Sequence, residues 1–283
     1  MLMDNNRQAV IENIKRFAQN GQFHNKTEIT DPVLTKEEEK EITSRFINNR
    51  DKLSYKIKKF FALLIADVGT KIINSKTEIK GIKTAQTLKD GFIDTSNHFS
   101  PLENTVIRSL TKKLSFNLSV VAQTSNFAMK GFLGYIMNYA DTIPISVDPR
   151  YLATSFLSVI KEKTVEKGQA VLIYPEQELW FNYRKPRPPK EGAYYFAAKL
   201  NIPVLSCFVE IRDYGKAKNG FKKTRYILHV LEVIYPEKEK TARENAFFMA
   251  QKDYEVKKAK YEEVYGKKLT YDFENGDIAG WEN

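Results

Sequence analysis

The stretch from Thr95 to Asn104, TSNHFSPLEN, places one of the chain's three histidines five residues before a carboxylate. A carboxylate that binds one ring nitrogen of a histidine fixes the tautomer and leaves the other nitrogen free to take a proton. His98 and Glu103 therefore have the chemistry of a general base and its orienting acid, acting on a substrate alcohol. The same two residues also fit an exposed loop histidine beside a glutamate that caps the next helix.

The residues around His98 predict how Glu103 is positioned. The apolar run GFIDTSN predicts a strand that ends just before His98. Ser100 is a typical N-cap and proline is tolerated in a first turn, so a helix is expected to begin near Pro101. Glu103 would then lie in that turn and reach back to the imidazole. Backbone N–H groups at this helix start are expected to face an oxyanion that develops on the substrate.

The hydrophobic pattern changes once along the chain. Up to about Asn74 it has helical spacing, and from Thr77 onward short apolar runs alternate with helical patterns. Strands are predicted over 77–82, 90–97, 115–123, 142–147, 169–176, 202–212 and 225–236. Helices are predicted over 102–114, 149–168, 190–201 and 240–265. This alternation predicts an α/β fold with a mostly parallel central sheet flanked by helices.

Three regions follow from this pattern. Residues 1–76 are predicted to form an N-terminal helical, membrane-associating region, and residues 77–239 the α/β domain. Residues 240–283 are predicted to form a charged helix and a tail whose final GDIAGWEN is loosely held.

The segment over 53–73 predicts an amphipathic helix. Its apolar residues follow steps of three and four along one face: Ile57, Phe60, Phe61, Leu64, Ile65, Val68 and Ile72. Lys52, Lys56 and Lys59 lie mostly on the opposite face or its flanks. The pattern is typical of a helix in a membrane interface, and it also fits an ordinary helix packed on a globular core.

The net charge of +10 favours an acidic partner such as nucleic acid, an anionic membrane or a charged metabolite. No zinc-finger spacing or aromatic RNP-like motif accompanies the charge, so the nucleic-acid interpretation depends on charge alone. No stretch approaches the roughly 18 apolar residues that span a bilayer, and the N-terminus lacks a secretory signal. A protein inside the cell is expected. The single Cys207 is predicted to be a buried, unreactive thiol, and no metal site is predicted.

Four segments occur in an order and at intervals that resemble the lysophospholipid acyltransferase family, which includes glycerol-3-phosphate and 1-acylglycerol-3-phosphate acyltransferases. The resemblance covers about 78–233, and the segments are NHFSPLE, GYIMNYADTIPIS, YPEQEL and IPVLSC. The chain departs from the family pattern in three blocks. Glu103 replaces an aspartate. Val147 replaces an arginine, for which Arg150 is a nearby candidate. Gln177, Glu178 and Leu179 replace the last three residues of F-P-E-G-T-R.

The resemblance implies roles for residues beyond the pair. In relatives that acylate glycerol phosphates, the lost third-block arginine is expected to hold the acceptor phosphate through paired bonds, which Leu179 cannot form. The basic loop NYRKPRPPK at 182–190 either replaces it, binds an anionic head group or donor arm, or is a solvated surface loop. Trp180, Phe181 and Tyr183 either line a sugar or acyl site or are buried packing. Glu176 is expected to support the site through hydrogen bonds. The residues assigned to acceptor or donor binding are Ser100, Asn104, Arg150, Glu176, Gln177, Arg184 and Lys185.

The function implied by the resemblance is transfer of a fatty acyl group from an acyl thioester to a hydroxyl of a lysophosphatidic acid-like lysophospholipid or a glycolipid. Acyl-CoA or acyl carrier protein would be a co-substrate, and no cofactor is implied. The protein is expected to be cytoplasmic and peripheral on the inner, anionic face of the membrane. The alternative is a catalytically degenerate family member that binds lipid or a partner protein, which the losses at Val147 and in EQEL favour. The sequence leaves the acceptor, the donor carrier and the chain length open.

Overall fold

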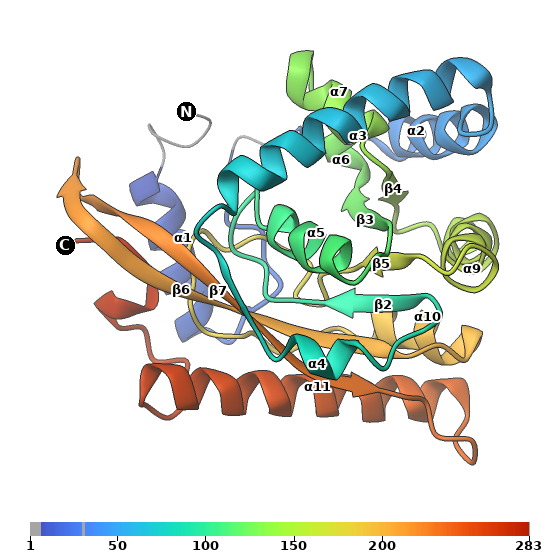
Figure 1. Cartoon of the computed structure of the whole chain (residues 1–283). Coiled ribbons are helices and arrows are strands. Elements are labelled where there is room, and N and C mark those ends of the chain that lie inside the picture. The colour runs from blue at the N-terminus through green and yellow to red at the C-terminus, as the bar shows by residue number, and fades with distance from the viewer. Residues whose placement is uncertain (1–6, 30–31, 283) are drawn as a thin grey trace.

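The computed structural model describes residues 7–29 and 32–282, and a seven-stranded sheet lies at its centre (Figure 1). The strand order is β1-β7-β6-β2-β5-β3-β4, and every neighbouring pair is parallel except β6 and β7. The strands are β1 Glu78–Lys80, β2 Phe92–Thr95, β3 Leu118–Gln123, β4 Thr142–Ile145, β5 Ala170–Leu172, β6 Val204–Lys218 and β7 Phe221–Ile234. The predicted α/β fold with a mostly parallel sheet is confirmed.

Helices cover both faces of this sheet. The N-terminal helices are α1 Arg7–Gln19, α2 Lys36–Asn49 and α3 Leu53–Ile73. The short or medium helices that follow are α4 Ile82–Ala85, α5 Asn104–Lys113, α6 Thr124–Phe127 and α7 Gly131–Tyr139. One continuous segment consists of α8 Pro149–Tyr151, the π-helical turn η1 Leu152–Phe156, α9 Leu157–Lys161 and the π-helical turn η2 Glu162–Glu166. The remaining elements are α10 Gly192–Leu200, α11 Ala242–Tyr265 and the short 3₁₀ turn η3 Asn275–Asp277.

Apolar side chains form a core on each face of the sheet, between the sheet and the helices that cover it. Residues of α9, α10 and α11 pack on one face of the sheet, and residues of α4 and α5 pack on the other. Helix α3 lies outside α5 and also contacts α7 (Figure 1). A third cluster joins α1 to the segment around Trp180 and Ile278. The N-terminal and C-terminal segments therefore both pack against the middle of the chain.

Helix α3 is packed with its apolar face outward. The seven residues predicted to share one face are all exposed: Ile57, Phe60, Phe61, Leu64, Ile65, Val68 and Ile72. The inward contacts are instead small or polar, with Ala62 and Thr70 buried and Lys59 paired with Asp141 at 2.7 Å. The alternative of a helix packed on the core through its apolar face is therefore wrong. Within the described residues, no helix is both long enough and apolar enough to cross a bilayer.

Two other expectations from the sequence are corrected. Strands β6 and β7 continue through residues 213–224, which the sequence pattern did not include in a strand. The C-terminal segment is held in place, because Ile278 and Ala279 are buried and the Glu282 N–H donates to the Gly220 carbonyl at 2.9 Å. The predicted loose tail is wrong because the segment extends the edge of β7 and has apolar residues to bury.

Candidate active site

His98 lies at the carboxyl end of β2, in the loop that joins the strand to α5. Strand β2 is paired on both sides, by β5 and β6, and all four of its residues are buried. Asn97 fixes the start of the loop, because its side chain donates to the Val209 carbonyl at 3.0 Å and accepts from the Val209 N–H at 2.8 Å. The loop therefore leaves the sheet at its carboxyl edge, where open α/β sheets bind ligands.

The predicted contact between His98 and Glu103 is present. Nδ1 of His98 meets Oε1 of Glu103 in a short contact. Oε2 of Glu103 accepts the N–H groups of Phe99 and, at 2.6 Å, Ser100. Glu103 is 2% exposed, so these donors replace water around its charge. Glu103 is thus held by the loop on which His98 lies.

The start of the helix differs from the prediction. Residues 101–103 form a turn, and α5 begins at Asn104. The N–H groups of Phe99 and Ser100 donate to Glu103, and that of Leu102 donates to the Ser100 hydroxyl. The Glu103 N–H donates to the Ser100 carbonyl. The expectation that N–H groups here face an oxyanion is wrong for these four, because the turn uses them internally.

The other face of His98 is held by an aromatic ring. The Tyr174 ring stacks on the imidazole with the centroids 4.1 Å apart and the planes 6° apart. The His98 side chain is 19% exposed, and Nε2 has no hydrogen-bond partner among the residues that the structure describes. The Tyr174 hydroxyl is buried without a partner in the same part of the chain. Burial and the charges of Glu103 and Asp94 raise the pKa of Tyr174, so the phenol is neutral.

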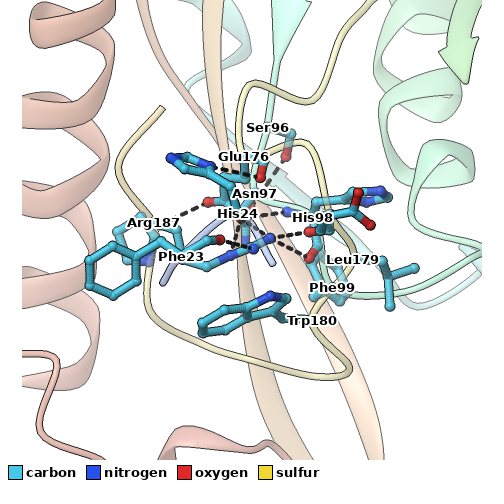
Figure 2. A network of polar contacts seen from close by, with 12 residues as sticks. Phe23, His24, Ser96, Asn97, His98, Phe99, Glu176, Leu179, Trp180 and Arg187 are labelled. Atoms are coloured by element: carbon cyan, nitrogen blue, oxygen red, sulfur yellow. Dashed lines mark hydrogen bonds and ion pairs between the residues drawn. The ribbon is translucent and has the colours of Figure 1, made fainter. Parts of the chain in front are cut away.

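A buried ion pair of Glu176 and Arg187 supports the loop (Figure 2). Glu176 accepts the His98 N–H at 3.2 Å and pairs with the Arg187 guanidinium at 2.9 Å. Arg187 also donates to the carbonyls of Phe23, Glu178 and, at 3.4 Å, His98. Its guanidinium lies 4.5 Å from the centre of the Trp180 ring. Glu176 and Arg187 thus bind the backbone N–H and carbonyl of His98, which is the kind of support expected of Glu176.

Three cations of the basic loop at 182–190 bind other parts of the chain, whereas Lys190 is exposed. Arg184 donates to the carbonyls of Ile211 and Gly276 and pairs with Asp213. Lys185 is 2% exposed and bonds Asp277 at 2.6 Å. Arg187, described above, is buried as well. The charges of Arg184 and Lys185 thus join distant segments of the chain, and their role in acceptor or donor binding stays a prediction.

The remaining predicted residues are spread around the carboxyl edge. Ser100 and Asn104 are half-buried and flank the turn that carries Glu103. Gln177 is exposed one residue after Glu176. Arg150 is exposed on α8 after β4, and β4 lies three strands from β2, about 14 Å away at 4.7–4.9 Å per strand. Arg150 therefore does not belong to the His98–Glu103 cluster.

Other residues named from the sequence are structural. Trp180, Phe181 and Tyr183 pack with α1, as the packing alternative predicted. Cys207 is buried as predicted, and burial raises the pKa of its thiol.

His24 and His229 lie outside the candidate pair. His24 has its Nδ1 3.3 Å from the Glu176 carbonyl. His229 is buried against Glu210, with Nε2 2.8 Å from the carboxylate.

The backbone at Gln177 explains one departure from the family pattern. Gln177 has φ +67°, the left-handed region that glycine occupies freely and other residues do not. The family has glycine at this position, and a non-glycine residue there costs roughly 1–2 kcal/mol. Arg187 holds the neighbouring Glu176 carboxylate through two hydrogen bonds, and these contacts offset the backbone strain at Gln177.

We expect Gln177→Gly to raise the free energy of unfolding by up to about 1 kcal/mol, since glycine relieves the strain but adds freedom to the unfolded chain. Urea denaturation measures the change. Gln177→Ala is the matched control, because alanine also lacks the glutamine side chain but keeps the strained backbone. Equal midpoints for the two variants would contradict the backbone explanation.

The family model described as acyltransferase matches residues 76–210. The crystal structure of the 1-acyl-sn-glycerophosphate (LPA) acyltransferase PlsC from Thermotoga maritima is similar, with 16% sequence identity and a TM-score of 0.48. That similarity covers 94% of this chain and 98% of the other chain. No curated protein matches the sequence.

Proposed function

Because this chain belongs to the acyltransferase family, as the match over residues 76–210 shows, we propose that it transfers a fatty acyl group from an acyl thioester to a lipid hydroxyl. The proposed acceptor is a lysophospholipid of the lysophosphatidic acid type or a glycolipid, and the proposed donor is acyl-CoA or acyl carrier protein. The observation that carries the proposal is the buried contact of Glu103 with Nδ1 of His98, which leaves Nε2 without a partner in the described part of the chain.

The proposed reaction uses His98 as a general base. Nε2 takes the proton of the acceptor hydroxyl while the hydroxyl oxygen attacks the carbonyl carbon of the thioester. The C–S bond of the resulting tetrahedral intermediate breaks, an ester forms, and the imidazolium returns its proton to the thiolate. Glu103 stabilises the imidazolium and keeps the proton on Nδ1 in the resting state. General-base assistance of this kind typically contributes about 10²–10⁴-fold in rate.

The acceptor cannot be held through the arginine that the family pattern has in the third block. Leu179 stands at that position, and its carbonyl accepts the Thr27 hydroxyl at 2.8 Å. The nearby Arg187 is buried and already bonds Glu176 and three backbone carbonyls. This chain therefore favours an acceptor whose phosphate, if it has one, is bound by other groups. Lysophospholipids other than lysophosphatidic acid and glycolipids stay within the proposal.

A thiol-release assay tests this function. The purified chain is given acyl-CoA or acyl carrier protein with a panel of lysophospholipids and glycolipids, and the product ester is identified by mass spectrometry. Acceptor-dependent thiol release supports the proposal. Acyl-chain binding without release for any acceptor in the panel would support the degenerate, lipid-binding alternative instead.

We further propose that the chain is peripheral on a membrane through α3. The exposed apolar residues of α3 extend along a helix of 21 residues, about 30 Å at 1.5 Å per residue. Phe60 and Phe61 are 65% and 53% exposed and contact each other edge to face. An exposed apolar strip of this size on a globular protein typically marks an interaction with a membrane or another molecule. Both substrates of the proposed reaction carry acyl chains, which favours the membrane.

We expect the combined variant Phe60→Gln, Phe61→Gln and Leu64→Gln to reduce partition onto lipid vesicles at least tenfold, because burying an apolar side chain contributes about 1.5–3 kcal/mol when complete. Vesicle flotation measures the partition. The fold should be unaffected, since all three side chains are exposed. Phe247→Gln is the control, because it removes an equally exposed aromatic ring from α11. Unchanged flotation of the triple variant would remove α3 from the interface.

A further inference from the structure

The hairpin of β6 and β7 extends beyond the other strands as a two-stranded ribbon, seen at the upper left of Figure 1. Residues 212–225 of this ribbon contain six Lys or Arg and a single acidic residue, Asp213. From 212 to 220 every residue is exposed. Like charges at such density repel one another, so an uncompensated cluster lowers the stability of the ribbon.

Some of the charges are compensated. Arg212 pairs with Glu210, Lys222 pairs with Glu282 at 2.6 Å, and Asp213 pairs with Arg184. Among the residues that the structure describes, the cations without an acidic partner are Lys216, Lys218, Lys223 and Arg225. The single acid of the ribbon is thus already paired, and Lys216, Lys218 and Lys223 are exposed, whereas Arg225 is half-buried.

One further lysine connects this cluster to α3. Lys76 lies three residues beyond the end of α3, and its Nζ is 6.0 Å from the centre of the Tyr214 ring. The Arg225 guanidinium is 4.5 Å from the centre of the same ring. Ile72 and Ile73, at the end of α3, are 70% and 39% exposed. The cationic ribbon therefore lies beside the end of the apolar strip of α3.

The same end of α3 is connected to the candidate active site. Asn74 donates to the Thr105 hydroxyl at 2.8 Å, two residues beyond Glu103. Leu102, immediately before Glu103, is 54% exposed. A surface that contacted both the end of α3 and the ribbon would thus lie close to the turn that orients His98.

We propose that the tip of the β6–β7 ribbon is a second membrane contact, which binds the head groups of anionic phospholipids beside the strip of α3. This proposal rests on the membrane association proposed above. An apolar strip with adjacent unpaired cations matches a bilayer, which offers acyl chains and anionic head groups in one plane. An acidic protein would match the cations but not the strip. Two contacts at one end of α3 would fix the orientation of the active-site turn toward the lipid.

The test compares two variants with equal charge. The ribbon variant carries Lys216→Gln, Lys218→Gln and Lys223→Gln. The control carries Lys199→Gln, Lys238→Gln and Lys258→Gln, three exposed lysines on α10, on the loop after β7 and on α11. Flotation is measured with phosphatidylcholine vesicles and with vesicles that also contain phosphatidylglycerol, at low and high salt. Thermal unfolding checks that both variants are folded.

We expect the ribbon variant to lose about fivefold in partition onto the anionic vesicles per removed charge, and about 100-fold in all, at low salt. The loss should shrink at high salt, and partition onto neutral vesicles should be unchanged. The control should bind anionic vesicles within a few fold of the original chain. An equal loss in both variants, or none in the ribbon variant, would overturn the proposal.

Two further outcomes separate this proposal from its premises. If the α3 variant fails to bind vesicles and the ribbon variant binds normally, membrane association stands and the role of the ribbon is wrong. If the ribbon variant binds normally but needs more acyl carrier protein, and not more acyl-CoA, to reach half-maximal rate, the ribbon docks an acidic protein and the lipid proposal is overturned.

Discussion

Replacing His98 with alanine is expected to lower kcat for acyl transfer about 10²–10⁴-fold, the usual contribution of a positioned general base. The variant should stay folded, because the backbone N–H and carbonyl of residue 98 make the contacts to Glu176 and Arg187, and an alanine retains both. Thiol release measures the rate, and circular dichroism with thermal unfolding checks the fold. A folded variant with the original rate would remove His98 from the mechanism.

Two variants at residue 103 separate orientation from charge. In Glu103→Gln the amide oxygen can accept the N–H groups of Phe99 and Ser100, which turns the NH₂ group toward Nδ1 of His98. The proton of the imidazole would then lie on Nε2, the wrong tautomer for a base, and the rate should fall at least tenfold. Glu103→Asp should also lower the rate, because the shorter side chain cannot keep all three donors. A rise in rate with aspartate would contradict this, and would show that the Glu103 carboxylate does not hold His98 in the most active position.

Replacing Arg187 with methionine is expected to lower the free energy of unfolding by about 3–5 kcal/mol, the usual cost of removing one partner of a buried ion pair. Glu176 is 3% exposed and would keep an uncompensated charge. The carbonyls of Phe23 and Glu178 would lose their donor as well. Urea denaturation monitored by fluorescence measures the change.

The double variant Glu176→Gln with Arg187→Met is the control for this explanation. It removes the buried charge together with its partner, so it should be more stable than Arg187→Met alone. A loss below about 1 kcal/mol in Arg187→Met would mean that water enters and solvates Glu176.

The parts of the fold that depend on local pattern could be predicted from the sequence. The alternation of apolar runs and helical patterns predicts the parallel sheet, and the spacing of three and four predicts which residues of α3 share a face. His98 and Glu103 are five residues apart, so their contact depends on one turn. Periodicity could not decide whether the face of α3 is buried, because both a core and a bilayer select the same apolar residues.

The parts that depend on distant partners could not be predicted. Buried Lys185 bonds Asp277, which is 92 residues away in the sequence. Buried Arg187 donates to the carbonyl of Phe23, which is 164 residues away. Nothing in the local sequence NYRKPRPPK distinguishes such cations from solvated ones. The ribbon of β6 and β7 is longer than expected because its polar residues resemble a loop, although the backbone pairing continues through them.

The contacts of Arg187 and its neighbours also determine the shortest fragment of this chain that is expected to fold alone. Three further contacts of this region come from outside residues 76–210: Phe23 accepts from Arg187, Asn25 accepts from the Trp180 indole, and the Thr27 hydroxyl donates to the Leu179 carbonyl. Strand β7, which pairs with both β1 and β6, also begins beyond residue 210. A fragment excised at the borders of the family match would therefore lose β7, which lies between β1 and β6 in the sheet. Arg187 would keep Glu176 and the carbonyl of Glu178 but lose the carbonyl of Phe23. The segments on both sides of the match therefore act as an intramolecular scaffold, and the stable folding unit is expected to be longer than the part that carries the motifs.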